Sequence, residues 1–448
     1  MRLKLKDYQV AGQAKIRGQS RIALYMEMRL GKTVMLTRWV EHHMRSKPAS
    51  LRALVVSRLS TLPGWRDHLR NEGHGAVLVR GDRACRRELC QGVGWRLIGY
   101  ESLRESPEIL DMDWDVIALD ESTAIRKPKP KISNLLCNKT RAPYRAVLSG
   151  LPAPESPLDY YPQMHFLHRQ FMGIGGALKE GYYSFRQKHF RQGWDGYTWT
   201  VKPASARKIR QAVAETGIVL SRADVNLGSC KIHERRVVPM NEEQERLMTS
   251  IKEEYSAVLA SGKRISTTWS VAKCAWLSRI AGGFDPDGNL INDAKIHELV
   301  DIVTGELRGE PVLVWFNYNE EKRHAVRALM DAGVSVADID GSTDLESRHE
   351  YCKLLNSGKI QALCFQVRTG LFGLDLAKAS TAIYYSNAYD GELRQQSEDR
   401  MIKITKDQPC LYVDMVSEGS ADERALELLK DKKLKSRYFM AKIMEGYK

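Results

Sequence analysis

Short apolar runs, each leading into a loop and then a helical stretch, most constrain what this chain can fold into. The runs cover residues 22–26, 53–56, 116–119 and 146–148 in the first half, and 312–316, 362–365, 382–385 and 411–415 in the second. Their apolar residues are continuous rather than alternating, which is typical of strands buried on both faces of a parallel sheet. Helical stretches between such strands form right-handed crossovers. The sequence therefore predicts an α/β fold with two parallel-sheet lobes and helical and hairpin insertions.

The pattern changes between the two blocks, from about residue 160 to residue 290, where helix formers and aromatic residues become more frequent. Within this segment, Asp195-Gly196 stands between aromatic residues, which predicts a tight hairpin. Lys202-Pro203 then predicts the start of a helix. We expect a first lobe at residues 1–228, with an insertion at about 160–228, and a second lobe at residues 229–448.

Composition narrows the classes of protein that this chain fits. No run of 18 apolar residues exists, and residues 1–10 are too polar for a secretory signal, so we expect a cytoplasmic location, in the host cytoplasm if the gene is phage-encoded. The eight cysteines are scattered without a C-x-x-C pair, which disfavours a zinc site or a disulfide framework. The net charge of +14 favours a polyanionic partner, although a basic protein without a nucleic-acid role also fits.

A phosphate-binding loop is predicted directly after the first apolar run, where Gly31-Lys32-Thr33 precedes a helical stretch. Gly31 lets the backbone approach phosphates, and successive N–H groups at a helix start bind the anion. Lys32 places a charge on the β and γ phosphates, and the Thr33 hydroxyl coordinates Mg²⁺. Met26 stands where the full motif has its first glycine, so an ordinary helix start is the alternative until a partner motif is found.

Asp120-Glu121 supplies that partner motif at the end of the run 116–119. The carboxyl ends of buried parallel strands form the sheet edge where ligands bind. There Asp120 can hold Mg²⁺ through water, and Glu121 can orient and deprotonate an attacking water. A helix cap or a solvated turn is the alternative, but the phosphate loop upstream favours the functional interpretation.

With these motifs in place, the chain resembles helicase superfamily 2, and within it the SWI/SNF-type translocases, over nearly its whole length. In the first half the matching segments are Leu5-x-x-Tyr8-Gln9, residues 27–33 (family E-M-G-L-G-K-T), residues 54–60 with Trp65, residues 99–103, residues 120–127 (D-E-x-H-x-I-K-N) and residues 148–152 (L-T-G-T-P). In the second half they are residues 340–343 with Arg348, residues 370–376 (G-G-x-G-x-N-L), residues 396–400 (Q-x-x-D-R) and residues 420–424. The chain looks like the compact versions carried by bacteriophages and mobile elements.

The resemblance implies that the two lobes are RecA-like, with ATP hydrolysis with Mg²⁺ between them, and that the protein moves along duplex or branched DNA, in replication, recombination or fork remodelling. It implies catalytic roles for Lys32, Asp120, Glu121, Arg400 and Lys403. It implies nucleotide contacts by Tyr8, Gln9, Arg29, Gly31, Lys32, Thr33, Gly373 and Asp375, and Mg²⁺ contacts by Thr33 and Asp120. It implies nucleic-acid contacts by Ser57, Arg58, Tyr100, Lys127, Gly341, Ser342 and Arg368. Arg222 marks the expected end of the first lobe.

Several positions depart from the family pattern. Thr123 replaces the DExH histidine, Asp375 replaces an asparagine, Arg29 replaces a glycine, and Lys403 replaces the second arginine of the closing R-x-x-R. These changes leave two other functions open. One is a DNA-binding scaffold with weak or no ATPase activity, and the other is an RNA-dependent helicase.

Two further segments have two interpretations each. The basic loop 126–131 is either a solvated surface loop or a contact to the phosphate backbone. The aromatic and basic stretch 185–199 either stacks bases or forms the core of a small subdomain.

Overall fold

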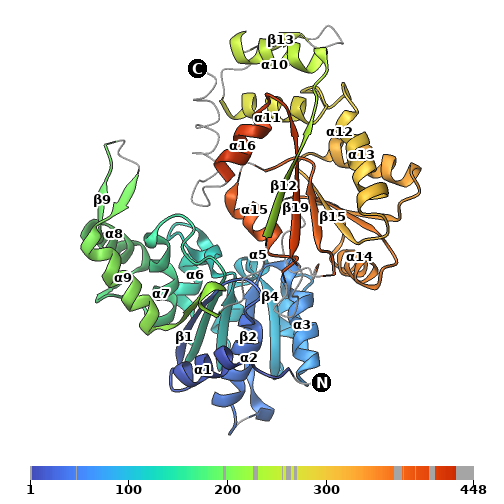
Figure 1. Cartoon of the computed structure of the whole chain (residues 1–448). Coiled ribbons are helices and arrows are strands. Elements are labelled where there is room, and N and C mark those ends of the chain that lie inside the picture. Colours follow the sequence, from blue (N-terminus) through green and yellow to red (C-terminus); the bar gives the residue numbers. More distant parts are fainter. Residues whose placement is uncertain are drawn as a thin grey trace. The chain divides into compact units, whose positions relative to one another are not determined.

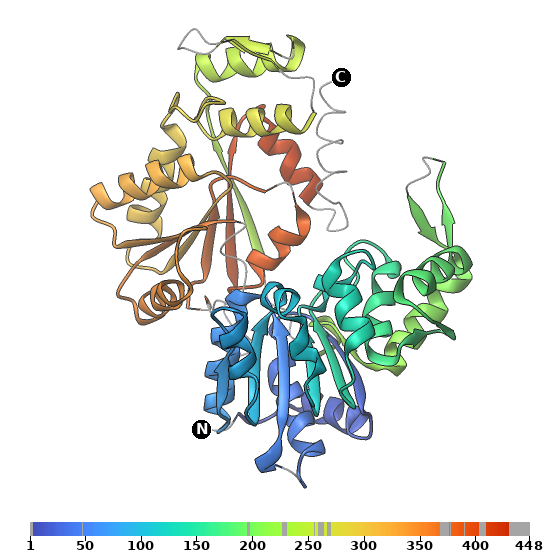
Figure 2. The same ribbon diagram turned by 180° about the vertical axis from the view of Figure 1, so that it is seen from behind.

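The computed structural model describes residues 3–46, 48–194, 198–225, 231–254, 256–258, 264–266, 270–367, 376, 378–388, 390–402 and 409–429. The chain divides into two compact units, residues 1–228 and residues 229–448. Each unit contains a sheet of parallel strands with helices on both faces (Figures 1 and 2), so the predicted α/β class is confirmed. None of the described helices is long and apolar enough to cross a membrane.

The sheet of the first unit has the strand order β11-β1-β6-β5-β2-β4-β3. Its strands are β1 (Arg21–Met26), β2 (Arg52–Ser57), β3 (Ala76–Leu78), β4 (Gly94–Gly99), β5 (Val116–Asp120), β6 (Tyr144–Ser149) and β11 (Gly217–Leu220), and every pairing is parallel. Residues of β1 alternate between two hydrophobic cores, one on each face: Ala23 and Tyr25 join one core, and Ile22 and Leu24 join the other. Burial on both faces explains why this strand is apolar throughout.

Helices α1 (Asp7–Ile16), α2 (Lys32–His43) and α3 (Leu62–Asn71) pack on one face of this sheet (Figure 1). The other core includes residues from α5 (Tyr100–Glu105), α6 (Lys131–Lys139) and α7 (Tyr160–His168). A further short helix is α4 (Arg83–Leu89). Turns of 3-10 helix lie at Pro48–Ser50, Leu59–Thr61, Pro107–Asp111, Ser122–Ile125, Pro157–Asp159 and Ala223–Val225.

The insertion of the first unit contains the short strands β7 (Gln170–Phe171) and β8 (Ile174–Gly175) and the helices α8 (Leu178–His189) and α9 (Pro203–Glu215). Between the helices, β9 (Phe190–Gln192) and β10 (Trp199–Val201) pair antiparallel, which confirms the predicted hairpin. Its turn residues 195–197 lie outside the described part of the chain. The predicted helix start is also confirmed, because Pro203 is the first residue of α9. After α9 the chain returns to the main sheet as β11, beside β1.

The sheet of the second unit has the order β12-β19-β18-β15-β17-β16, again with every pairing parallel. Its strands are β12 (Lys231–Val238), β15 (Val312–Phe316), β16 (Val336–Ile339), β17 (Ala362–Gln366), β18 (Thr381–Tyr384) and β19 (Cys410–Ser417). The helices are α10 (Glu242–Glu254), α11 (Ser270–Ala281), α12 (Ala294–Asp301, continued by a π-helical turn at Ile302–Glu306), α13 (Asn319–Asp331), α14 (Leu345–Ser357), α15 (Gly391–Glu398) and α16 (Ala421–Leu429). A separate pair of strands, β13 (Ser256–Val258) and β14 (Arg264–Ser266), follows α10.

Candidate functional site

The loop between β1 and α2 has an unusual backbone. Gly31, the residue before α2, has φ 82°, and Arg29 has φ 68°. Both angles lie in the left-handed region, which glycine adopts freely and other residues adopt at a cost of roughly 1–2 kcal/mol. A Cβ added to Gly31 would clash with the Gln9 side-chain nitrogen, so the Gln9 amide would have to leave its present position. Arg29 occupies the position where the family sequence has glycine, and its backbone angle explains that preference.

Lys32 begins α2 and turns back over this loop. Its Nζ donates to the carbonyl oxygens of Met26 at 2.9 Å and Glu27 at 3.3 Å. A Cβ built on Gly150, in the loop after β6, would lie 3.1 Å from Met28 Cγ and 3.6 Å from Lys32 Nζ. The loop that follows β6 therefore packs directly against the loop that follows β1.

The start of α1 is tied to the same loop. Gln9 is buried, and its Nε2 donates to the carbonyl of Leu30 at 3.1 Å. The Tyr8 hydroxyl donates to the same carbonyl at 3.3 Å, and burial raises the pKa of Tyr8. These two residues, which are predicted to contact the nucleotide, thus lie against the loop predicted to hold phosphates.

Arg222, at the edge of the sheet, also restrains the phosphate loop. The backbone N–H of Arg222, just after β11, donates to Glu27 Oε2 at 3.0 Å, and its guanidinium donates to the same oxygen at 3.1 Å. The position that was expected to end the first lobe is therefore also a structural partner of the phosphate loop.

Asp120 and Glu121 lie at the carboxyl end of β5, as predicted. Asp120 Oδ2 accepts hydrogen bonds from Ser57 Oγ at 3.0 Å and from Trp65 Nε1 at 2.8 Å. Within the described part of the chain, no group donates to its other oxygen, Oδ1, which is therefore available to a further ligand. Glu121 has φ 49°, a second strained residue beside the loop edge.

Ser57 and Tyr100, which are predicted to contact nucleic acid, are both buried. Ser57 is 0% exposed and Tyr100 is 6% exposed. The Tyr100 hydroxyl donates to the backbone carbonyl of Asp120 at 2.8 Å, and burial, followed by the nearby Asp120 and Glu121 charges, raises its pKa well above the usual value. Both side chains are hydrogen-bonded to Asp120. Arg58, next to Ser57, is half-buried.

The basic loop after the carboxylates is partly neutralised. Arg126 and Lys127 both form ion pairs with Glu155, and Lys127 Nζ lies 3.8 Å from Asp159 Oδ1. Burial raises the pKa of Asp159 to about 6, although the Lys127 charge acts in the opposite direction. The Lys127 side chain remains 44% exposed, so this residue can still be reached from solvent.

Gln163 is a buried residue of this site that the sequence motifs did not indicate. Its Oε1 accepts from the hydroxyls of Tyr25 at 3.2 Å and Ser122 at 2.6 Å. Its Nε2 donates to the carbonyls of Pro152 at 2.7 Å and Asp159 at 2.9 Å. One amide therefore joins the ends of β1 and β5 to the loop after β6. A glutamine inside a helix carries no recognisable signal of such contacts.

In the second unit, the segment 340–343 forms a tight loop. Asp340 Oδ1 accepts from Ser342 N at 2.9 Å and Ser342 Oγ at 2.6 Å. These bonds and the Lys322 ammonium at 2.9 Å hold the pKa of Asp340 well below its usual range. Arg348, which belongs to the same matching segment, donates to the Thr343 and Asp340 carbonyls. It therefore holds the backbone of this loop. Gly341 and Ser342 are exposed.

Arg400, which is predicted to be catalytic, follows helix α15 and is not part of it. Helix α15 ends at Glu398, and Arg400 lies in the turn that follows, where its N–H donates to the Ser397 carbonyl at 3.2 Å. Asp399, directly before Arg400, pairs with Lys231 at 3.1 Å and so restrains this turn. Four predicted site residues, Arg368, Gly373, Asp375 and Lys403, lie outside the described residues.

Arg394, one helical turn before Glu398, is the centre of a buried ionic network in the second unit. Its guanidinium contacts Asp414 and Glu398, and its Cζ lies 3.4 Å from the centre of the Tyr384 ring. Glu398 also pairs with Lys231 at 2.8 Å. The segment that resembles the closing motif is therefore held to β12 and β19 by ion pairs and to β18 by a cation–π contact.

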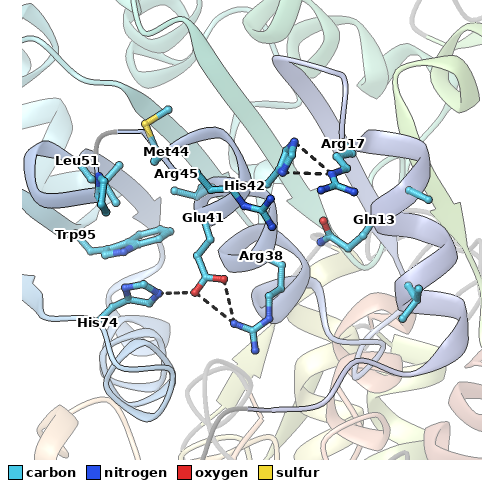
Figure 3. A pocket seen from close by; sticks show the side chains of 14 residues that line it. Gln13, Arg17, Arg38, Glu41, His42, Met44, Arg45, Leu51, His74 and Trp95 are labelled. Carbon is cyan, nitrogen blue, oxygen red and sulfur yellow. Dashed lines mark hydrogen bonds and ion pairs between the residues drawn. The ribbon is translucent and has the colours of Figure 1, made fainter.

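A pocket of about 820 Å³ lies elsewhere on the first unit (Figure 3). Its lining includes Gln13, Arg17, Arg38, His42, Leu51 and Trp95. Leu51 precedes β2 and Trp95 is near the start of β4, so this pocket lies at the amino ends of the strands. Asp120 ends β5 at the opposite edge of the same parallel sheet. The pocket is therefore distinct from the predicted site.

Comparisons with known proteins place these motifs in context. A model described as SNF2-related domain matches residues 18–268, and one described as helicase conserved C-terminal domain matches residues 294–405. The chain is 20% identical to the SWI/SNF-related matrix-associated actin-dependent regulator of chromatin subfamily A member 1 of Homo sapiens, over 94% of this chain and 42% of that protein. It is 23% identical to the ISWI chromatin-remodeling complex ATPase ISW1 of Saccharomyces cerevisiae, over 90% of this chain and 37% of that protein. The chain thus spans less than half the length of these curated relatives.

Among solved structures, the Sulfolobus solfataricus SWI2/SNF2 ATPase core in complex with dsDNA aligns with a TM-score of 0.45 and 18% identity, covering 100% of this chain and 94% of that chain.

Proposed function

The chain belongs to the SNF2-related family of helicase-like ATPases, and we propose that it is a motor that couples ATP hydrolysis to movement along duplex or branched DNA. The proposal includes a task in replication, recombination or fork remodelling. The net charge of +14 supports a polyanionic track.

One observation carries this proposal: the phosphate loop and the carboxylate pair share one sheet edge. The strands β1 and β5 both pair with β6, so the loop before Lys32 and the pair Asp120-Glu121 leave the sheet at neighbouring carboxyl ends. Gly150, which follows β6, packs on Met28 of the phosphate loop. Three loops of this kind form the usual setting for phosphoryl transfer at the edge of a parallel sheet.

The residues present fit a Mg²⁺-bound nucleotide. The loop at Gly31 has the left-handed backbone of a phosphate loop, and Asp120 Oδ1 accepts no bond from a described residue. Thr33 and Asp120 would hold Mg²⁺, which when bound would neutralise charge on the phosphate oxygens. Lys32 would move from the Met26 and Glu27 carbonyls to the phosphates, an exchange of weak acceptors for charged ones. Glu121 would orient the attacking water and accept its proton.

Gly31 offers a direct test of the phosphate loop. In Gly31→Ala, the new Cβ meets Gln9 and the left-handed backbone costs roughly 1–2 kcal/mol, so the loop leaves its conformation unless the ligand restores it. We expect nucleotide affinity to fall about tenfold, measured by titration of a fluorescent ATP analogue. Gly18→Ala is the matched control, because nothing lies within 4 Å of its added Cβ. Equal affinities for the two variants would contradict this site.

The motor is tested by turnover on different polymers. We expect ATPase activity to be stimulated by duplex DNA more than by single-stranded DNA or RNA, and affinity for the duplex to be nearly independent of its base sequence. Each phosphate contact should add about −0.9 to the slope of log affinity against log salt concentration. Stimulation by RNA alone would favour the RNA-dependent helicase. Tight DNA binding without turnover would favour the scaffold.

A further inference from the structure

The β9–β10 hairpin projects beyond helices α8 and α9 of the first unit (Figure 1). Trp194, which follows β9, has a relative exposure of 109%, so no described residue covers its ring. At the base of the hairpin, by contrast, Phe185 and Phe190 are 0% and 2% exposed and belong to the hydrophobic core. The two interpretations of this aromatic stretch therefore apply to different residues. The base is core, and Trp194 is a large apolar group held in water.

Basic side chains gather near the base of the hairpin. Residues 178–210 contain eight Lys and Arg against two Asp and Glu, and so supply six of the net +14 charges. Lys188 in α8, Lys202 before α9 and Lys208 in α9 all lie close enough to His189 to lower its pKa, after the larger effect of its burial. Three separate elements thus bring positive charge to one place.

No described carboxylate balances these charges. Among the described residues, no carboxylate forms an ion pair with Lys188, Lys202 or Lys208, and Lys202 Nζ donates only to backbone carbonyls, at 2.8 and 3.3 Å. In the same unit, Lys127 of the basic loop pairs with Glu155. Because neighbouring like charges repel, an unbalanced cluster favours the binding of a polyanion, which releases its counterions.

We propose that this hairpin is a DNA contact separate from the motor site, where the lysines hold phosphates and Trp194 stacks on an unpaired base beside a duplex. Lysines that hold phosphates, together with an aromatic ring that stacks on a base, are the combination that binds single strands. The bases of an intact duplex stack on one another and leave no face for an indole ring. The occupant is therefore DNA at a fork or junction. This inference rests on the DNA partner proposed above, but it does not require ATP turnover.

Stacking is tested with a forked duplex that carries 2-aminopurine as its first unpaired base, in the absence of nucleotide. The full chain is expected to quench this base and to bind the fork more tightly than a blunt duplex. Trp194→Ala should abolish the quenching and weaken fork binding about tenfold, while blunt-duplex affinity changes less than about twofold. Trp194→Phe should restore part of the quenching, because a smaller ring still stacks. The exposed position of Trp194 means that no core contact is lost.

Charge is tested separately with Lys188→Gln/Lys208→Gln, which should reduce the salt slope of fork binding by about one and a half to two. The control Arg70→Gln/Arg87→Gln removes two exposed charges elsewhere on this unit and should leave the slope unchanged. Unaltered fork binding and quenching in Trp194→Ala would overturn the inference, as expected if the indole serves a protein partner. Loss of fork binding in Trp194→Ala, together with a wild-type protein that does not hydrolyse ATP, would support the hairpin contact and contradict the proposed motor function. Wild-type protein that binds no DNA would overturn both.

Discussion

Arg400→Ala is expected to lower DNA-stimulated kcat by about 10³-fold or more, the scale of an arginine that stabilises charge during phosphoryl transfer. The family resemblance assigns this role to Arg400 and to position 403, where this chain has lysine. A guanidinium offers a planar fork of donors, whereas an ammonium offers one compact charge. Lys403→Ala should therefore cost much less than Arg400→Ala, and Lys403→Arg should equal or exceed the wild type. The wild type would then be an active but slow ATPase.

The measurement is kcat at saturating ATP and DNA for the three variants. Arg327→Ala is a suitable control in the same unit, because the Arg327 side chain is 85% exposed and its only ion pair among the described residues is with Asp331 in its own helix. If Lys403→Ala is as inactive as Arg400→Ala, lysine replaces the second arginine fully. If neither change matters, the closing motif has been assigned to the wrong residues.

Glu121→Gln is expected to lower kcat by about 10²–10⁴-fold while ATP still binds, because the attacking water loses its base. Gln has the same shape as Glu, so the strained backbone at φ 49° is unchanged and the loss reports on the carboxylate. Lys32→Ala should instead lower nucleotide affinity as well as turnover, since it removes the ammonium group that would contact the phosphates. Nucleotide titration and single-turnover hydrolysis separate the two effects.

The control for Glu121→Gln is Glu101→Gln, a nearby carboxylate whose side chain is 67% exposed and pairs only within its own short helix among the described residues. It should retain wild-type turnover. Wild-type turnover in Glu121→Gln would remove this residue from the mechanism and direct the search to another base.

The central strands could be predicted from sequence because burial on both faces leaves a continuous apolar run, as in β1 and β15. The strands that were missed include short strands and edge strands. β3 and β11 have three and four residues, and the edge strand β12 reads Lys-Ile-His-Glu-Arg-Arg-Val-Val, with charges along its middle. Edge strands pair on one side only, so their composition resembles that of loops.

The site was predictable where local backbone geometry demands a residue type, as at Gly31, and not where distant segments meet. The contact of Trp65 with Asp120 joins residues 55 positions apart, and that of Glu27 with Arg222 joins residues 195 apart. Ser57 is a residue that a motif indicated but whose surroundings the sequence did not reveal. Its motif suggested a role next to nucleic acid, but its hydroxyl is buried against Asp120. Sequence position alone does not say which way a side chain points.

The amide of Gln163 has a consequence for how this unit tolerates change. It accepts from two hydroxyls and donates to two carbonyls, so its four bonds use both ends of the amide in one orientation. Glutamate at this position has no donor for the carbonyls of Pro152 and Asp159, and leucine leaves all four partners without this bond. Each unsatisfied buried group costs about 1–3 kcal/mol. Three segments that are far apart in sequence therefore depend on one amide. A substitution at Gln163 affects all three segments at once.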